Sequence, residues 1–150
     1  MDKLVLAKEN RPTSFERQSP EETTRQTATE DSPNWLVAAR AAESKKAKDL
    51  LILDLREVTS FTEFFVICTA SNQRQAQTIA DEIGYQLKQI GELPVSAEGY
   101  DTAEWILLDY GDFLVHVFSE TARAYYELER LWRGAKTVDP AKGAREFSAG

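Results

Sequence analysis

Hydrophobic residues from position 32 onward follow two patterns, short apolar runs and a helical spacing. Ser32 suits an N-cap and Pro33 a first helical position, so the Ala-rich segment after them predicts a helix to about Lys48. The runs 50–55 and 64–69 have the length and composition of buried strands. We therefore expect a first helix followed by two central strands.

Two further helices are predicted later in the chain. Ser71 opens a stretch with apolar residues on one helical face, which Gly91 ends. Those apolar residues are Ala76, Ile79, Ala80, Ile83, Leu87 and Ile90. Ser119 suits the N-cap of a final helix over residues 120–133.

Three more strands are predicted between these helices. Residues 93–96 suit a weak edge strand because they contain a proline, and 104–109 and 113–118 are stronger strands joined by a tight turn at Tyr110-Gly111. The order αββαβββα predicts an α+β (mixed α/β) fold with about five strands in a mixed sheet flanked by helices.

Both ends of the chain differ in composition from this central part. Residues 1–33 contain eight Ser or Thr and almost no apolar residue after Leu6, which predicts a disordered N-terminal tail. An import leader is the alternative, but such leaders are poor in acids and this segment has seven. We expect one domain over 34–133 and a flexible C-terminal tail over 134–150.

The composition excludes several classes of protein. A chain of 150 residues has room for one ordinary core, and no apolar run approaches the roughly 18 residues of a membrane helix. The formal net charge is -7 and the pI is near 4.8, which disfavours direct nucleic-acid binding as the main activity. An acidic protein prefers a basic partner.

Candidate catalytic and metal-binding residues are few. Cys68 and His116 are the sole cysteine and histidine, which leaves no intrachain disulfide and no zinc site with paired cysteines or imidazoles. We interpret Cys68 as a core residue in a reducing compartment, and His116 as a satisfied sheet histidine on the face of Leu114 and Phe118. No Gly-rich phosphate loop or nucleophile motif is present, so we expect no cofactor.

Acidic and aromatic residues gather between positions 92 and 129. This stretch has nine Asp or Glu, and Arg123 is its only base. A solvated face is one interpretation. Aromatic anchors of the kind found at interfaces accompany the acids, which favours docking onto a basic protein. These anchors are Trp105, Tyr110, Tyr125, Tyr126 and the nearby Trp132.

Three blocks in this region carry a resemblance to a known family. The blocks W-x-x-x-D-Y-G-D (105–112), V-H-V-F (115–118) and Y-x-L-E-x-L-W (126–132) follow the runs 47–54 and 64–69 in order. In this pattern, over about residues 34–133, the chain resembles the ribosomal silencing factor family, also called Iojap. The resemblance implies a nucleotidyltransferase-like fold without the catalytic motif, and a homodimer. It further implies a cytoplasmic repressor that binds a ribosomal protein on the joining face of the large subunit and blocks small-subunit joining.

The resemblance also implies which residues contact the partner. On these motifs we expect partner binding by two clusters, Trp105, Asp109, Tyr110, Gly111 and Asp112, and then Tyr126, Glu129 and Trp132. Trp105 shares a strand face with Leu107, so an interface role and a core role both stay open. We expect Gly111 to shape the loop rather than to contact anything.

An enzyme of the metal-dependent nucleotidyltransferase type is the alternative function. Asp109 and Asp112 would hold its divalent ion. Asp and Gly also favour turns for backbone reasons, and the Gly-Ser motif with a paired Asp-x-Asp that two-metal nucleotide transfer needs is absent. We therefore predict a binding protein with no catalytic residue and no metal site.

Overall fold

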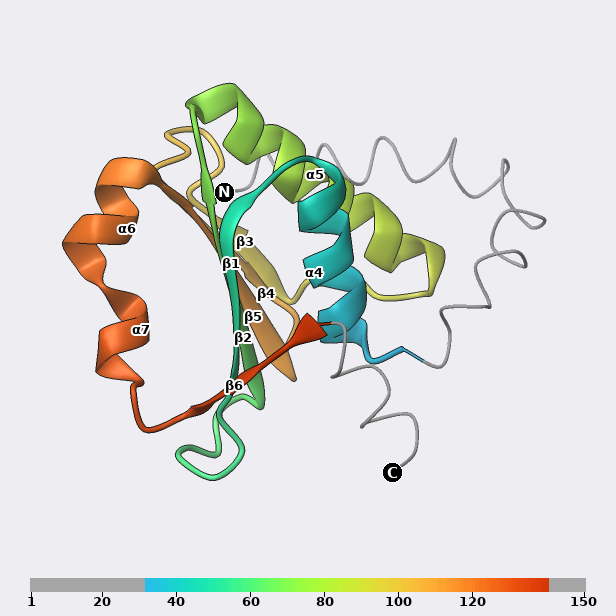
Figure 1. Cartoon of the computed structure of the whole chain (residues 1–150). Helices are drawn as coiled ribbons and strands as arrows, with labels where there is room; N and C mark the ends of the chain where they lie inside the picture. The colour runs from blue at the N-terminus through green and yellow to red at the C-terminus, as the bar shows by residue number, and fades with distance from the viewer. Residues whose placement is uncertain (1–31, 141–150) are drawn as a thin grey trace.

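A computed structural model describes residues 32–140, which form a sheet with helices on both faces (Figure 1). The predicted tail over 1–33, apart from its last two residues, lies outside the described residues, as does 141–150. In chain order the elements are α4 (Asn34–Ser44), β1 (Lys48–Asp54), β2 (Phe64–Ala70), α5 (Gln73–Gln89), β3 (Ser96–Glu98), β4 (Trp105–Asp109), β5 (Phe113–Ser119), α6 (Glu120–Tyr126), α7 (Leu128–Leu131) and β6 (Lys136–Val138).

The six strands lie in the order β3-β4-β5-β2-β1-β6. Strands β2 and β5 pair in parallel at the centre, from Phe64 opposite Phe113 to Ala70 opposite Ser119, and all the other pairs are antiparallel. Every residue of β2 is buried, which confirms its prediction as a central strand. The mixed α+β prediction is confirmed as well.

Helices α4 and α5 cover the first face of the sheet. The predicted apolar face of α5 packs here against Ile106, Leu108, Val115 and Val117 from β4 and β5. Cys68 belongs to this core, as predicted, and burial raises the pKa of its thiol to about 12.

Helices α6 and α7 lie on the second face, opposite α4 and α5 (Figure 1). Ala122 and Leu128 pack there against buried side chains of the central strands, which include Leu53, Phe65, Ile67 and Phe118. None of the helices within residues 32–140 combines the length and apolar composition of a membrane span.

The sheet has six strands rather than about five. Lys136–Val138 pairs antiparallel with residues 52–54 of β1, inside the range predicted as a flexible C-terminal tail. A three-residue segment has too few positions to show an alternating pattern. These residues form a strand because they pair with the otherwise open edge of β1.

The start and end of the first helix differ from the prediction. Its N-cap is Pro33 rather than Ser32 and makes no side-chain capping bond. The helix ends at Ser44 rather than near Lys48, because Lys46 takes a left-handed φ of 66° and turns the chain into β1.

The predicted final helix over 120–133 is two helices. Its N-cap is confirmed, since Ser119 Oγ accepts a hydrogen bond of 3.0 Å from the Ala122 N–H. Glu127 adopts a left-handed φ of 47°, which ends α6 and redirects the chain into α7. The redirection lets Leu128 reach the core of the second face.

Candidate docking surface

Alternate residues of β4 and β5 form an incompletely covered part of the second face. Trp105, Leu107 and Asp109 share this face of β4, and all three are half-buried. The antiparallel register pairs Trp105 with Phe118, Leu107 with His116, and Asp109 with Leu114. Helix α6 packs on β5 and β2, so the β4 row keeps access to solvent.

Trp105 lies at the centre of an aromatic cluster. Its ring centroid is 4.9 Å from that of Phe118 and 4.7 Å from that of Tyr126. Its indole Nε1–H donates a 3.0 Å hydrogen bond to Nδ1 of His116. Trp105 therefore packs against core residues with part of its side chain and exposes another part to solvent. The core role and the interface role that the sequence left open are both compatible with this position.

His116 lies beneath this cluster and is 3% exposed. Burial without a counter-charge lowers its pKa to about 3, so the imidazole is neutral at physiological pH. The prediction of a histidine on the sheet is confirmed, but the expectation that it is satisfied holds for only one of its two ring nitrogens. One ring nitrogen has the indole as partner, and Nε2 has none among the described residues.

The left-handed Glu127 separates the residues predicted as a second cluster. Tyr126, at the end of α6, lies against Trp105. Trp132 follows α7 and instead contacts Phe61 and Phe65, with ring centroids 5.9 and 5.6 Å away. We therefore group Tyr126 with Trp105, and assign Trp132 to the adjoining apolar region.

Glu129 has an internal ionic partner. Arg123 Nε lies 3.2 Å from Glu129 Oε2, and Arg123 Nη1 donates to Thr69 Oγ1 at 2.8 Å. The one base of the acidic stretch is thus held by one of its acids. This pair ties α6 and α7 to β2, and Glu129 acts first as a structural residue.

The turn between β4 and β5 holds Asp109 in place. Its Oδ1 accepts a 2.8 Å hydrogen bond from the Gly111 N–H. Gly111 has a φ of 86°, and a Cβ added there would meet nothing within 4 Å. Backbone conformation alone therefore requires the glycine, in agreement with the loop-shaping role predicted for it.

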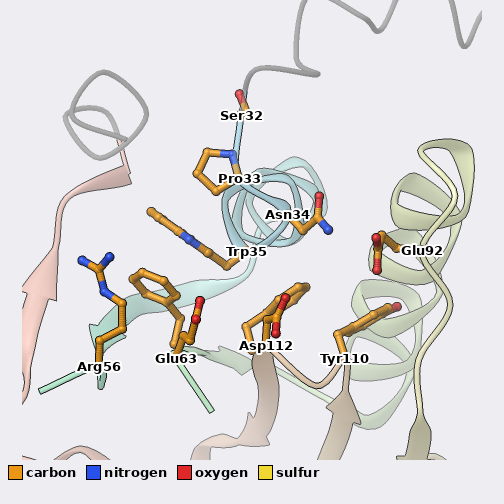
Figure 2. A pocket seen from close by; sticks show the side chains of 11 residues that line it. Ser32, Pro33, Asn34, Trp35, Arg56, Glu63, Glu92, Tyr110 and Asp112 are labelled. Atoms are coloured by element: carbon orange, nitrogen blue, oxygen red, sulfur yellow. The ribbon is translucent and has the colours of Figure 1, made fainter. Parts of the chain in front are cut away.

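Tyr110 and Asp112 lie on the other side of the sheet. Both line a pocket of about 370 Å³ beside the start of α4, together with Trp35 and Phe64 (Figure 2). Tyr110 is 7% exposed and stacks on Phe113 at 5.0 Å. The structure therefore separates the residues predicted as one cluster, and Tyr110 is a core residue.

The same separation bears on the predicted Asp109 and Asp112 pair. Asp112 lines the pocket, whereas Asp109 shares the face of Trp105 and caps the turn. Within residues 32–140, no group of three His, Cys, Asp or Glu side chains is placed to hold a metal ion. The two carboxylates therefore have different surroundings: Asp109 binds the turn, and Asp112 lines the pocket.

Three carboxylates lie along β4 and beside it. Glu98 on β3 is exposed and pairs in register with Leu107, which puts it on the same face. Exposed Glu104 precedes Trp105 and accepts a 2.7 Å hydrogen bond from Ser119 Oγ. With Asp109, these side chains form an acidic rim beside apolar groups.

We call this region the docking face: Trp105, Leu107, Asp109, Leu114 and Tyr126. Leu107 and Leu114 were not predicted as site residues. Their signal in the sequence was the two-residue period that places Leu107 beside Trp105. Apolar strand residues usually belong to a core, so this period alone could not identify a surface.

Together, the sheet and the docking face define a small mixed α/β domain with an aromatic surface bounded by acids. A protein-family model described as "Ribosomal silencing factor during starvation" matches residues 17–149. The chain belongs to this ribosomal silencing factor family.

Individual relatives agree with this assignment. The ribosomal silencing factor of Bacillus subtilis is 41% identical over 103 residues, which cover 69% of this chain and 87% of that protein. The chloroplastic Iojap protein of Zea mays is 38% identical over 105 residues, 67% of this chain and 44% of that protein.

Solved structures show the same fold. A crystal structure of a Chromobacterium violaceum protein superposes with a TM-score of 0.64 at 36% identity, covering 71% of this chain and 92% of that one. A Bacillus halodurans structure gives a TM-score of 0.62 at 38% identity, covering 69% and 93%.

Proposed function

We propose that the chain docks through its docking face onto a basic protein at the joining face of the large ribosomal subunit. There it blocks joining of the small subunit and so represses translation. The observation that supports this most is Trp105, a large aromatic residue that is only half-buried on a sheet face with carboxylates nearby. It occurs here in a member of the ribosomal silencing factor family.

The chemistry of the docking face suits a basic protein partner. Trp105 and Tyr126 provide large aromatic area near the centre, where interfaces concentrate their binding energy. Glu98, Glu104 and Asp109 at the rim favour approach of a positive surface and raise the association rate. Ribosomal proteins are commonly basic because they contact phosphates.

Steric exclusion is sufficient for the blockade. A folded chain of this length has a radius of gyration of about 15 Å. Bound at the joining face, it holds apart surfaces that must come into contact. The proposed action makes and breaks no covalent bond, needs no cofactor and takes place in the cytoplasm. We also propose a homodimer, which sedimentation showing only monomer at micromolar concentration would contradict.

Substitution of Trp105 tests the proposal. Trp105→Ala removes the central anchor, and we expect co-sedimentation with purified large subunits to weaken by tenfold or more, on the order of 2 kcal/mol. Light scattering of mixed subunits should then show joining restored. Leu131→Ala is the matched control, because Leu131 is 75% exposed but lies on α7, outside the docking face.

Two results would contradict the proposal. One is wild-type affinity in a folded Trp105→Ala protein, which would exclude this face. The other is bound wild-type protein that leaves subunit joining unchanged, which would exclude the blockade. Urea unfolding of each variant separates lost contact from lost folding.

A further inference from the structure

We infer that His116 is a positioning residue for docking: its Nδ1 holds the indole of Trp105 in the orientation that the partner meets. The inference rests on the proposed function, since it assigns Trp105 as the anchor. His116 itself is 3% exposed and is not expected to touch the partner.

The indole N–H of Trp105 has its acceptor inside the protein. Its ring lies among Phe118, Tyr126 and the imidazole, and neither Phe118 nor the faces of the other rings offer a strong acceptor to an N–H. An N–H buried without a partner costs free energy, so the 3.0 Å bond to His116 favours one rotamer of Trp105.

The imidazole is well placed to act as a fixed acceptor. Its centroid lies 4.5 Å from that of Phe65, edge to face, and 6.0 Å from that of Phe118 in a stacked arrangement. The β5 strand that carries it pairs with β4 on one side and β2 on the other. Because Nδ1 accepts the hydrogen bond from the indole N–H, the neutral ring carries its own proton on Nε2, which has no partner among the described residues.

The hydrogen bond to His116 determines what Trp105 can offer to the partner. The indole N–H is already engaged inside the protein, so Trp105 offers its ring rather than a hydrogen-bond donor to the partner. An immobilised side chain also loses less rotamer entropy on binding, which increases affinity without a new contact. His116 therefore contributes to docking through Trp105.

Two variants of His116, one that keeps an acceptor and one that does not, test the inference. His116→Asn keeps an oxygen acceptor near the position of Nδ1, whereas His116→Leu has a similar shape and no acceptor. We expect His116→Leu to weaken binding to large subunits by about five- to tenfold, the equivalent of one hydrogen bond. His116→Asn should stay within about twofold of the wild type.

A spectroscopic readout shows whether the hydrogen bond itself is responsible. In a ¹H–¹⁵N spectrum, Trp105→Phe identifies the Trp105 indole resonance by its disappearance. We expect this indole proton to be protected from solvent exchange in the wild type and in His116→Asn, and to exchange faster in His116→Leu. In a Trp105→Phe background, where the donor is gone, His116→Leu should weaken binding no further.

The outcomes decide between the alternatives. Unchanged binding in a folded His116→Leu protein, or an equal loss in the Trp105→Phe background, would overturn the positioning role. If the wild type itself does not bind large subunits, the proposed function fails. The indole exchange rates, measured without ribosomes, then still decide whether His116 fixes Trp105.

Discussion

The two faces of the sheet differ in how completely helices cover them. The first face lies under α4 and α5, with 11 and 17 residues, whereas the second lies under α6 and α7, with 7 and 4. At 1.5 Å per residue, α5 is about 25 Å long and α6 about 10 Å. The short helices cover β5 and β2 but leave the β4 row half-buried. The first face is therefore a closed core, whereas the second has the accessible surface on which we propose binding.

The largest expected effect is a difference in stability between variants of two neighbouring leucines of β4. Leu108 points into the first face with 0% exposure, and we expect Leu108→Ala to lower the free energy of unfolding by about 2–5 kcal/mol. Leu107 points to the second face and is half-buried, so Leu107→Ala should cost about 1 kcal/mol. Urea unfolding measures both.

Binding to large subunits should rank the two leucine variants in the opposite order. Leu107→Ala removes part of the docking face, whereas Leu108→Ala leaves that face intact wherever the protein stays folded. Equal stability losses, or an unchanged affinity for Leu107→Ala, would show that the faces do not divide the two roles in this way.

The second prediction uses the pKa of His116, which burial lowers from 6.5 to about 3. The unfolded chain binds a proton below about pH 6.5 that the folded protein does not bind until about pH 3. This contribution to stability is therefore complete above pH 6.5 and decreases as the pH falls toward 3. Between pH 7.5 and pH 5, the loss of this contribution lowers the free energy of unfolding by about 2 kcal/mol.

Comparison with His116→Asn isolates this contribution. The carboxylates titrate in both proteins, so the difference between their stability losses from pH 7.5 to 5 reports on His116. We expect the wild type to lose more, as measured by urea unfolding at each pH. Equal losses would mean that the imidazole is protonated in the folded protein, and that the second face is more open to water than its burial indicates.

The smallest expected effect compares two carboxylates near one turn. Asp109→Asn removes a charge at the docking face but keeps an oxygen for the Gly111 N–H. We expect association with large subunits to slow about two- to fivefold at low salt, and the difference to vanish at high salt. Asp112→Asn, on the pocket side, should match the wild type in stopped-flow measurements; the reverse ranking would move the contact to the pocket.

Much of the fold could be predicted from local patterns. The apolar run at 64–69 predicted the buried strand β2, and the helical spacing from Ala76 to Leu87 predicted the covered face of α5. Ser119 predicted the start of α6. These features depend on contacts between residues close in sequence, or on a period that a single element imposes.

Only the tertiary structure decided the rest. Residues 136–138 become a strand because β1 has an open edge, and the break at Glu127 directs Tyr126 and Trp132 to different neighbours. Sequence motifs grouped Tyr110 with Trp105, yet one is a core residue near the pocket and the other lies on the docking face. The sequence determined which strand residues share a face of the sheet. Whether an outward side chain was covered depended on the length and direction of helices folded back from elsewhere in the chain, because burial is a property of several packed segments together.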